Sequence, residues 1–153
     1  MNRPTSCYSL ATLWYVGDLP ARGTVATLVA AALLWYLGEA FNTFFLAVFL
    51  TLLAVFSIHA VLRRFKEKDP KQIIIDEVAG FWWTLIGLPM SFDYICAAIV
   101  LFRFFDISKW FGVEYCERFP GAWGVVLDDC YAGILTNLTL RFVVFVSSYV
   151  LLH

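Results

Sequence analysis

Charged side chains are scarce in this sequence. Asp, Glu, Lys and Arg make up 15% of its 153 residues, against about 25% in an average soluble domain. Hydrophobic residues make up 61% and aromatic residues 18%. So little polar material could not cover the surface of a soluble protein of this size. The composition therefore predicts a small membrane protein with one domain, residues 1–153.

Several sequence signals are also missing. The four cysteines, Cys7, Cys96, Cys116 and Cys130, form no C-x-x-C pair and no zinc-binding spacing, so we interpret them as small apolar side chains. The first apolar run has no basic segment before it and no small-residue cleavage site after it, which argues against a cleavable signal peptide. We expect the lipid bilayer as a partner and no nucleic acid. The oligomeric state stays open.

Long apolar runs predict an all-α bundle of about four to five membrane-embedded helices. We expect residues 1–21 to be a lead-in at the membrane interface, followed by passes over residues 24–37, 41–62, 73–88, 92–105 and 129–152. Thr24 is the expected N-cap of the first pass, and Asp128-Asp129 are expected to open the last. The first, third and fourth passes are shorter than a full span of ~20 residues and could instead be re-entrant.

The positions of the basic residues predict the orientation. Five of the eleven Lys and Arg lie within residues 63–71, whereas the opposite face would carry only Glu39 and Asp93. By the positive-inside rule the basic face is cytoplasmic. Arg141 does not fit, because it would lie about 20 Å into the last helix at 1.5 Å per residue. Either its side chain snorkels or that helix leaves the membrane early.

Ionisable residues gather in three stretches of this apolar chain. Residues 73–80 contain two adjacent carboxylates, residues 103–109 contain two cations and a carboxylate, and residues 127–133 contain a second adjacent pair. In order, these side chains are Asp76, Glu77, Arg103, Asp106, Lys109, Asp128 and Asp129. Because ionisable groups near lipid are costly, they are functional candidates, and the predicted topology brings all three stretches to one face.

Five carboxylates without imidazole or thiolate favour Mg²⁺, or Mn²⁺, over zinc. Arg103 and Lys109 lie three residues before and after Asp106, and such cations suit phosphate oxygens. Carboxylates, a divalent cation and phosphate-binding cations together make a phosphoryl-transfer site. The alternative is a structural network of ion pairs that ties helix ends together.

Three further residues are weaker candidates for a role at the site. His59 lies one turn from the basic loop and could carry protons, although a neutral histidine satisfied at the helix boundary is the better explanation. Thr24 is first a helix cap and second a phosphate contact. Gly80 lies one turn after Asp76, where its missing side chain would let a neighbouring helix or a lipid headgroup approach. The sequence has no D-x-D-x-T and no C-x5-R motif, so the nucleophile could be water or a carboxylate.

The three stretches, in their order and spacing, resemble the phosphatidylglycerophosphatase A family. The resemblance runs from about Gly17 to Leu140 and rests on Asp69-Pro70 and on residues 74–80 (IIDEVAG), 102–109 (FRFFDISK) and 127–134 (LDDCYAGI). Two departures stand out. Arg22 stands where that family usually has proline, and residues 109–112 read KWFG instead of K-P-W-P.

The resemblance implies a Mg²⁺-dependent integral-membrane phosphatase of bacterial phospholipid biosynthesis. It would convert phosphatidylglycerophosphate to phosphatidylglycerol and inorganic phosphate, in the inner membrane and with its site facing the cytoplasm. In our mechanistic hypothesis Arg103 and Lys109 bind the phosphate, and Asp106 is a metal ligand or a base. The remaining carboxylates would hold Mg²⁺: Asp76, Glu77, Asp128 and Asp129.

Other functions need weighing. A CDP-alcohol phosphotransferase also uses clustered aspartates and Mg²⁺, but its D-x-x-D-G-x-x-A-R signature is absent. A transporter or a non-enzymatic cation-binding membrane protein would be expected to place carboxylates near mid-membrane. A phosphatase of related lipid phosphates, such as phosphatidic acid, stays open as well.

Overall fold

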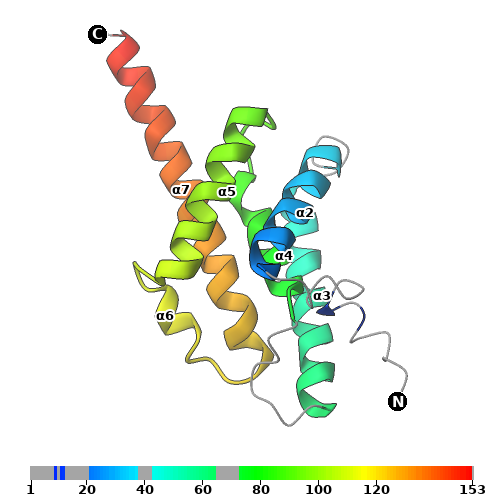
Figure 1. Cartoon of the computed structure of the whole chain (residues 1–153). Helices are drawn as coiled ribbons and strands as arrows, with labels where there is room; N and C mark the ends of the chain where they lie inside the picture. Colours follow the sequence, from blue (N-terminus) through cyan, green and yellow to red (C-terminus); the bar gives the residue numbers. More distant parts are fainter. Residues whose placement is uncertain (1–8, 10, 13–20, 38–42, 65–72, 153) are drawn as a thin grey trace.

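The described part of the chain is built from helices alone (Figure 1). The structure is a computed structural model that describes residues 9, 11–12, 21–37, 43–64 and 73–152. Its elements are α2 (Arg22–Leu37), α3 (Thr43–Arg64), α4 (Ile75–Trp82), the 3-10 helix η2 (Trp83–Leu85), α5 (Phe92–Ser108), α6 (Val113–Cys116) and α7 (Ala122–Leu152). The predicted all-α fold is therefore confirmed for these residues. Most of the lead-in at residues 1–21 and of the basic loop at 63–71 lies outside them.

The short helix α4 is the centre of the bundle. It packs against α2, α3 and α7, while α5 covers α7 and part of α2. All of its eight residues except Glu77 are buried, as expected for a helix that is apolar nearly all round. Phe81 of α4 meets Phe102 of α5 edge to face, with ring centroids 5.5 Å apart. The core therefore forms around α4, and the carboxylates at its start are held by that packing.

Glycines let α4 and α7 cross in close contact. A Cβ added at Gly80 would lie 2.6 Å from backbone and Cβ atoms of Asp129, and one added at Gly133 would meet the carbonyl oxygen of Gly80. The prediction that Gly80 admits a neighbouring helix is confirmed, and that helix is α7. Because the crossing places Gly80 against Asp129, the two acidic stretches at residues 76–77 and 128–129 must lie close together.

Two predicted helix starts are wrong. Helix α7 begins at Ala122, directly after Gly121, whose φ of 67° makes the turn. Asp128 and Asp129 therefore lie inside the helix, where the macrodipole, which acts mainly in the first turn, gives little reason for them. Helix α2 begins at Arg22, and the backbone N–H of Val25 donates to the carbonyl of Ala21. Thr24 thus lies within the first turn of α2 and is not its N-cap.

The predicted pass over residues 73–88 is interrupted. Helix α4 ends at Trp82, η2 adds three residues, and the chain turns at Gly87, with a φ of 66°. The side chain of Asn137 donates to the carbonyls of Thr84, at 2.9 Å, and Ile86, at 3.1 Å. Arg141 donates to Ile86 O at 2.6 Å and to Asn137 Oδ1 at 2.8 Å. Arg141 therefore binds the Ile86 carbonyl at this helix end, a role that the sequence did not predict.

Two of the described helices are long and apolar enough to cross a membrane. They are the 21 residues Thr43–Arg63 and the 29 residues Ala122–Val150. This is fewer than the four to five membrane-embedded helices predicted, because α2 has 16 residues and α4 only eight. Only 28% and 33% of their most apolar windows are buried, and large side chains such as Phe45, Phe56 and Phe145 point outward. An apolar exterior of this kind favours membrane association.

Candidate active site

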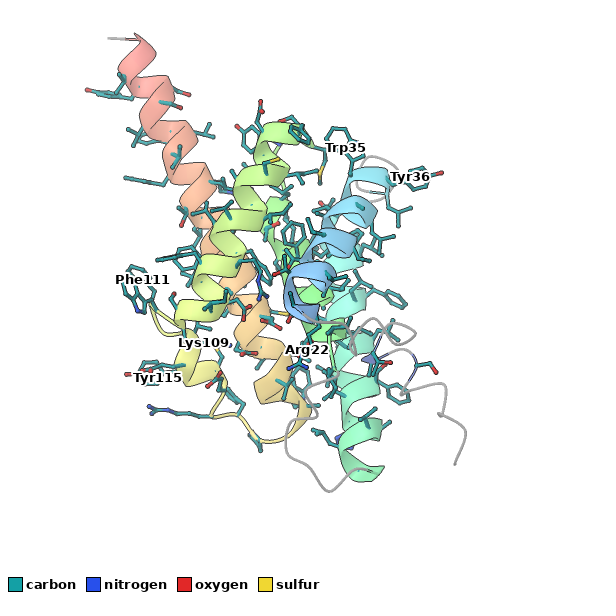
Figure 2. All side chains as sticks on the ribbon, viewed as in Figure 1. Arg22, Trp35, Tyr36, Lys109, Phe111 and Tyr115 are labelled. Carbon is teal, nitrogen blue, oxygen red and sulfur yellow. The ribbon has the colours of Figure 1, made fainter. Side chains whose placement is uncertain are left out.

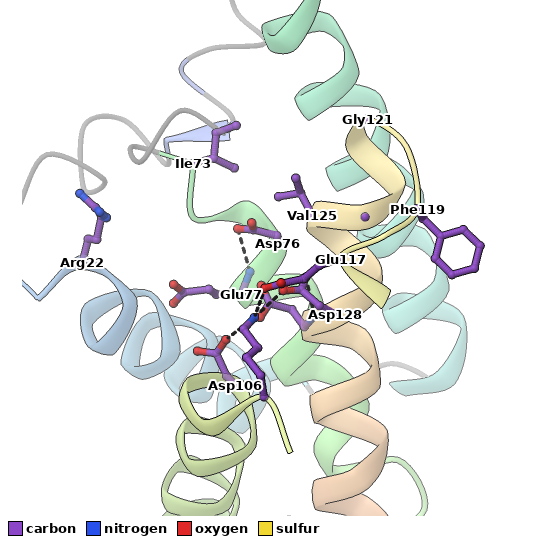
Figure 3. A pocket seen from close by; sticks show the side chains of 13 residues that line it. Arg22, Ile73, Asp76, Glu77, Asp106, Glu117, Phe119, Gly121, Val125 and Asp128 are labelled. Atoms are coloured by element: carbon purple, nitrogen blue, oxygen red, sulfur yellow. Dashed lines mark hydrogen bonds and ion pairs between the residues drawn. The ribbon is translucent and has the colours of Figure 1, made fainter. Parts of the chain in front are cut away.

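The start of α2, the start of α4, the end of α5 and the second turn of α7 meet around one cavity of about 730 Å³ (Figure 3). Thirteen residues line it, and among them are all five predicted carboxylates and Lys109. Arg22 and Glu117 join them from α2 and from the segment after α6. The convergence of the three charged stretches is therefore a feature of the structure.

Lys109 binds three of the lining carboxylates. Its Nζ lies 2.5 Å from Asp128 Oδ2, 3.3 Å from Glu117 Oε1 and 3.5 Å from Asp106 Oδ1. Burial lowers the pKa of Lys109, but the nearby carboxylates, Asp128 above all, outweigh burial and place that pKa above its usual range. Lys109 therefore stays charged and joins the end of α5 to α7.

Arg103 also orders two carboxylates, Glu77 and Asp106, and it shares Asp106 with Lys109. Its Nη1 donates to Asp106 Oδ2 at 2.7 Å and to Glu77 Oε2 at 3.3 Å. The i,i+3 pairing of Arg103 with Asp106 is as expected from the spacing. Arg103 is not among the thirteen lining residues, so here its guanidinium positions Glu77 and Asp106. Gly23 makes room for this pair, since a Cβ there would lie 2.7 Å from Glu77 Oε1 and 2.8 Å from Arg103 Nη2.

Asp76 and Asp129 are buried carboxylates, 8% and 4% exposed. Neither makes an ion pair with any residue that the structure describes. Burial first, and then the charge of Glu77, raise the pKa of Asp76 well above its usual range. Burial also raises the pKa of Glu77 to about 7, against the lowering effect of Arg103. A buried carboxylate without a cation is costly, so this end of the cavity suits a positively charged ligand.

The carboxylate oxygens are ligands that suit Mg²⁺, but their arrangement is not that of a complete metal-binding site. Across the described ranges, no three His, Cys, Asp or Glu side chains are arranged to hold one metal ion together. However, Mg²⁺ often keeps several waters and uses only one or two carboxylates plus substrate phosphates. The lining carboxylates suit an ion held in that open manner, and they do not form a closed protein cage.

Besides Arg103, the structure leaves two predicted residues outside the cavity lining. Thr24 on α2 and His59 on α3 are both exposed, and neither is among the lining residues. Their roles as substrate contacts stay predictions without geometric support. Sequence reasoning missed Arg22, Gly23 and Glu117 as parts of the site. The sequence holds no signal for Glu117, whereas Gly23 precedes a long apolar run and could have been weighed as a close-contact position.

Together these features define a bundle that is all-helical over the described residues, with two helices long and apolar enough to cross a membrane and an acidic cavity at one end. The sequence profile of the phosphatidylglycerophosphatase A family matches residues 9–144. The chain therefore belongs to that family, and the resemblance noted from the three motifs is confirmed.

Individual relatives agree with this assignment. Phosphatidylglycerophosphatase A of Escherichia coli is 30% identical over 126 residues, which cover 79% of this chain and 73% of the relative. The Haemophilus influenzae protein of the same name is 40% identical over 68 residues, 43% of this chain and 42% of the relative. A Bacteroides thetaiotaomicron protein, provisionally named a phosphatidylinositol-3-phosphatase, is 38% identical over 76 residues, 48% of each chain. This chain thus matches about half the length of two of these relatives. No solved structure shows significant similarity.

Proposed function

We propose that this protein is a membrane lipid phosphatase that hydrolyses phosphatidylglycerophosphate to phosphatidylglycerol and inorganic phosphate. Family membership and the Escherichia coli relative support the reaction. The observation that carries the proposal is the single cavity in which Asp76, Asp106, Lys109 and Asp128 meet from α4, α5 and α7. Carboxylates and cations around one cavity suit phosphate chemistry better than a set of separate helix-end ion pairs would.

Mg²⁺ is part of this proposal. Asp76, Glu77, Asp128 and Asp129 would supply its protein oxygens, directly or through water. When bound, the ion would act as a Lewis acid on the phosphate oxygens and offset their charge. The support is the pair of buried carboxylates, Asp76 and Asp129, that have no cation partner among the described residues.

The chain's own residues would share the remaining work. Lys109 Nζ already lies between Asp106 and Asp128, where an ammonium group can bind a phosphate oxygen and stabilise developing charge. Arg103 would hold Asp106 in place through their 2.7 Å contact. Asp106 could then take a proton from an attacking water while the bond from phosphorus to the glycerol oxygen breaks. A carboxylate nucleophile is the alternative route.

We also propose that the protein lies in the bacterial inner membrane with its cavity facing the cytoplasm. Helices α3 and α7 would cross the bilayer. Aromatic side chains surround the cavity end and are half or more exposed: Trp110, Phe111, Tyr115 and Phe119. Aromatic residues favour the headgroup layer, so a lipid could enter from the side with its acyl chains still in the bilayer.

Phosphate release tests the proposal directly. Purified protein in detergent is given short-chain phosphatidylglycerophosphate, with Mg²⁺ or with a chelator. We expect chelation to abolish release and Asp128→Asn to lower it about 100-fold or more, because the carboxylate charge is lost at constant shape. Asp93→Asn is the matched control, since Asp93 is exposed at the far end of α5. Equal release by wild type and Asp128→Asn would show that the site is not here.

A second substrate class has specific support from the Bacteroides thetaiotaomicron relative. Phosphatidylinositol-3-phosphate also carries a terminal phosphate on a phospholipid headgroup. The same assay with this lipid and with phosphatidic acid compares kcat/KM across the three substrates. Preference for the inositol lipid would replace the substrate named above and leave the site unchanged.

A further inference from the structure

The cavity is larger and more acidic than one phosphate group requires. Its volume of about 730 Å³ lies within the ~300–1,000 Å³ typical of sites for whole small ligands. Among the residues that the structure describes, six carboxylates line it but only two cations, namely Arg22 and Lys109. Within this lining, an anionic headgroup depends on these two side chains and on any bound metal ion.

The two lining cations differ in what they already bind. Lys109 is held by Asp106, Asp128 and Glu117. Arg22 makes no ion pair within the described part of the chain, although its charge lowers the pKa of Glu77. Among the described residues, Arg22 is thus the lining cation that no carboxylate holds, which makes it the better candidate to bind a ligand.

The backbone holds Arg22 in place beside the site. The neighbouring Gly23 packs against Glu77 and Arg103, and its carbonyl accepts a hydrogen bond of 2.9 Å from Thr27 Oγ1. Figure 2 shows Arg22 and Lys109 well apart, one from the start of α2 and the other from the end of α5. A ligand that touches both must therefore carry two anionic groups some distance apart.

We propose that Arg22 binds the phosphodiester of the substrate headgroup, while the terminal phosphate lies near Lys109. This inference rests on the function proposed above. An arginine fork pairs well with the two free oxygens of a phosphodiester. The site then selects phospholipids with two phosphates and disfavours phosphatidic acid, which has only one. Arg22 is thus the residue that determines specificity for lipids with two phosphates.

The two products of the proposed reaction separate the two phosphate positions. Short-chain phosphatidylglycerol carries only the diester, and inorganic phosphate carries only the released group. For Arg22→Gln we expect KM for short-chain phosphatidylglycerophosphate and Ki for phosphatidylglycerol to rise about 10- to 100-fold. Ki for inorganic phosphate should move less than about threefold. Arg22→Lys should recover part of the loss, because it restores charge without the fork.

Arg118→Gln is the matched control, because Arg118 is exposed and stacks on the Tyr115 ring outside the cavity lining. Thermal unfolding of each variant confirms that it is folded. A rise in Ki for inorganic phosphate equal to that for phosphatidylglycerol would overturn the proposal, and so would no change in either.

Failure of the proposed function gives a different result. If wild type releases no phosphate from phosphatidylglycerophosphate, equilibrium binding of short-chain phosphatidylglycerol decides the role of Arg22. Weaker binding by Arg22→Gln would support the diester contact, and equal affinity would exclude it.

Discussion

Glu77 is a cavity carboxylate whose charge changes near neutral pH. Burial raises its folded pKa to about 7 from the ordinary 4.5, although Arg103 works in the opposite direction. Below pH 4.5 the folded and unfolded states both hold the proton, and Glu77 costs no stability. Between 4.5 and 7 only the unfolded state releases it, so stability falls as pH rises through this window.

Replacement of Glu77 by glutamine should remove that pH dependence. Without divalent cations, we expect the melting temperature of wild type to fall relative to that of Glu77→Gln as pH rises from about 4.5 to about 7. Above that window the difference should level off. Thermal unfolding in detergent measures both curves, with Asp93→Asn as the control for a lost surface charge. Parallel wild-type and Glu77→Gln curves would mean that Glu77 titrates normally.

Gly80 should be intolerant of any side chain. A methyl group there would meet Asp129 backbone atoms at 2.6 Å, so Gly80→Ala must push α7 away or fail to fold. We expect a loss of about 3 kcal/mol or more, and loss of phosphate release even where the variant is folded, because Asp129 moves. Gly121→Ala makes the same chemical change in open space and should cost only about 1–2 kcal/mol for its positive φ. Equal activity in both variants would contradict this account of the crossing.

The types of residue at the site could be predicted from the sequence better than their partners. Carboxylates stand out in an apolar chain, and the spacing of Arg103 and Asp106 on one helix fixes their pairing. Arg22 and Glu117 lie at the edges of irregular segments, where no periodicity indicates the direction of a side chain. The partners of Lys109 could not be predicted either, because they depend on the left-handed backbone conformation of Lys109, whose φ is 54°.

At the level of elements, α4 depends on a polar clamp from α7. Asn137 and Arg141 donate hydrogen bonds to the carbonyls of Thr84 in η2 and of Ile86 directly after it, where the helical segment that continues α4 ends. Away from water such carbonyls are costly when unpaired. The clamp lies at the opposite end of α4 from Asp76, so it holds the helix that presents the carboxylates.

Asn137→Ala should therefore destabilise the bundle. Two carbonyls, those of Thr84 and Ile86, lose donors at 2.9 and 3.1 Å, and we expect a cost of about 1–3 kcal/mol. Thr139→Ala on the same helix is the matched control, since Thr139 Oγ1 donates only to the Leu135 carbonyl of its own helix. Thermal unfolding in detergent compares the two. A similar melting temperature for both variants would show that the hydrogen bonds of Asn137 do not stabilise the bundle.

The end of α4 and the start of α7 are two helix boundaries that differ from the prediction. Residues 73–88 are apolar almost throughout, so nothing local distinguishes the stop at Trp82 from a continuing helix. The stop depends on hydrogen bonds from residues more than 50 positions later in the chain. The start of α7 does have a local signal, because Pro120-Gly121 is a dipeptide typical of turns, but the charge pair at 128–129 favoured a later start.

At the scale of the whole molecule, the two ends of the bundle differ in charge. The cavity end carries the ionisable residues of α4, α5 and α7 and the exposed Arg63 at the end of α3. The far end of the described bundle, where α5 begins, carries Asp93. If Thr43–Arg63 and Ala122–Val150 are spans, the positive-inside rule supports our proposal that the cavity end faces the cytoplasm.

Cysteine labelling in cells tests this orientation. In a variant with all four native cysteines replaced by serine, Glu114→Cys marks the cavity end and Asp93→Cys marks the far end, because both positions are exposed. We expect a membrane-impermeant maleimide to label Asp93→Cys in right-side-out spheroplasts and Glu114→Cys only in inside-out vesicles. Phosphate release by the cysteine-free protein confirms that the background is intact. The reverse pattern would place the cavity on the outer face, where a substrate made in the cytoplasm would have to cross the bilayer first. Labelling of both positions from one side would instead mean that α5 does not separate the two faces, and that only α3 and α7 set the topology.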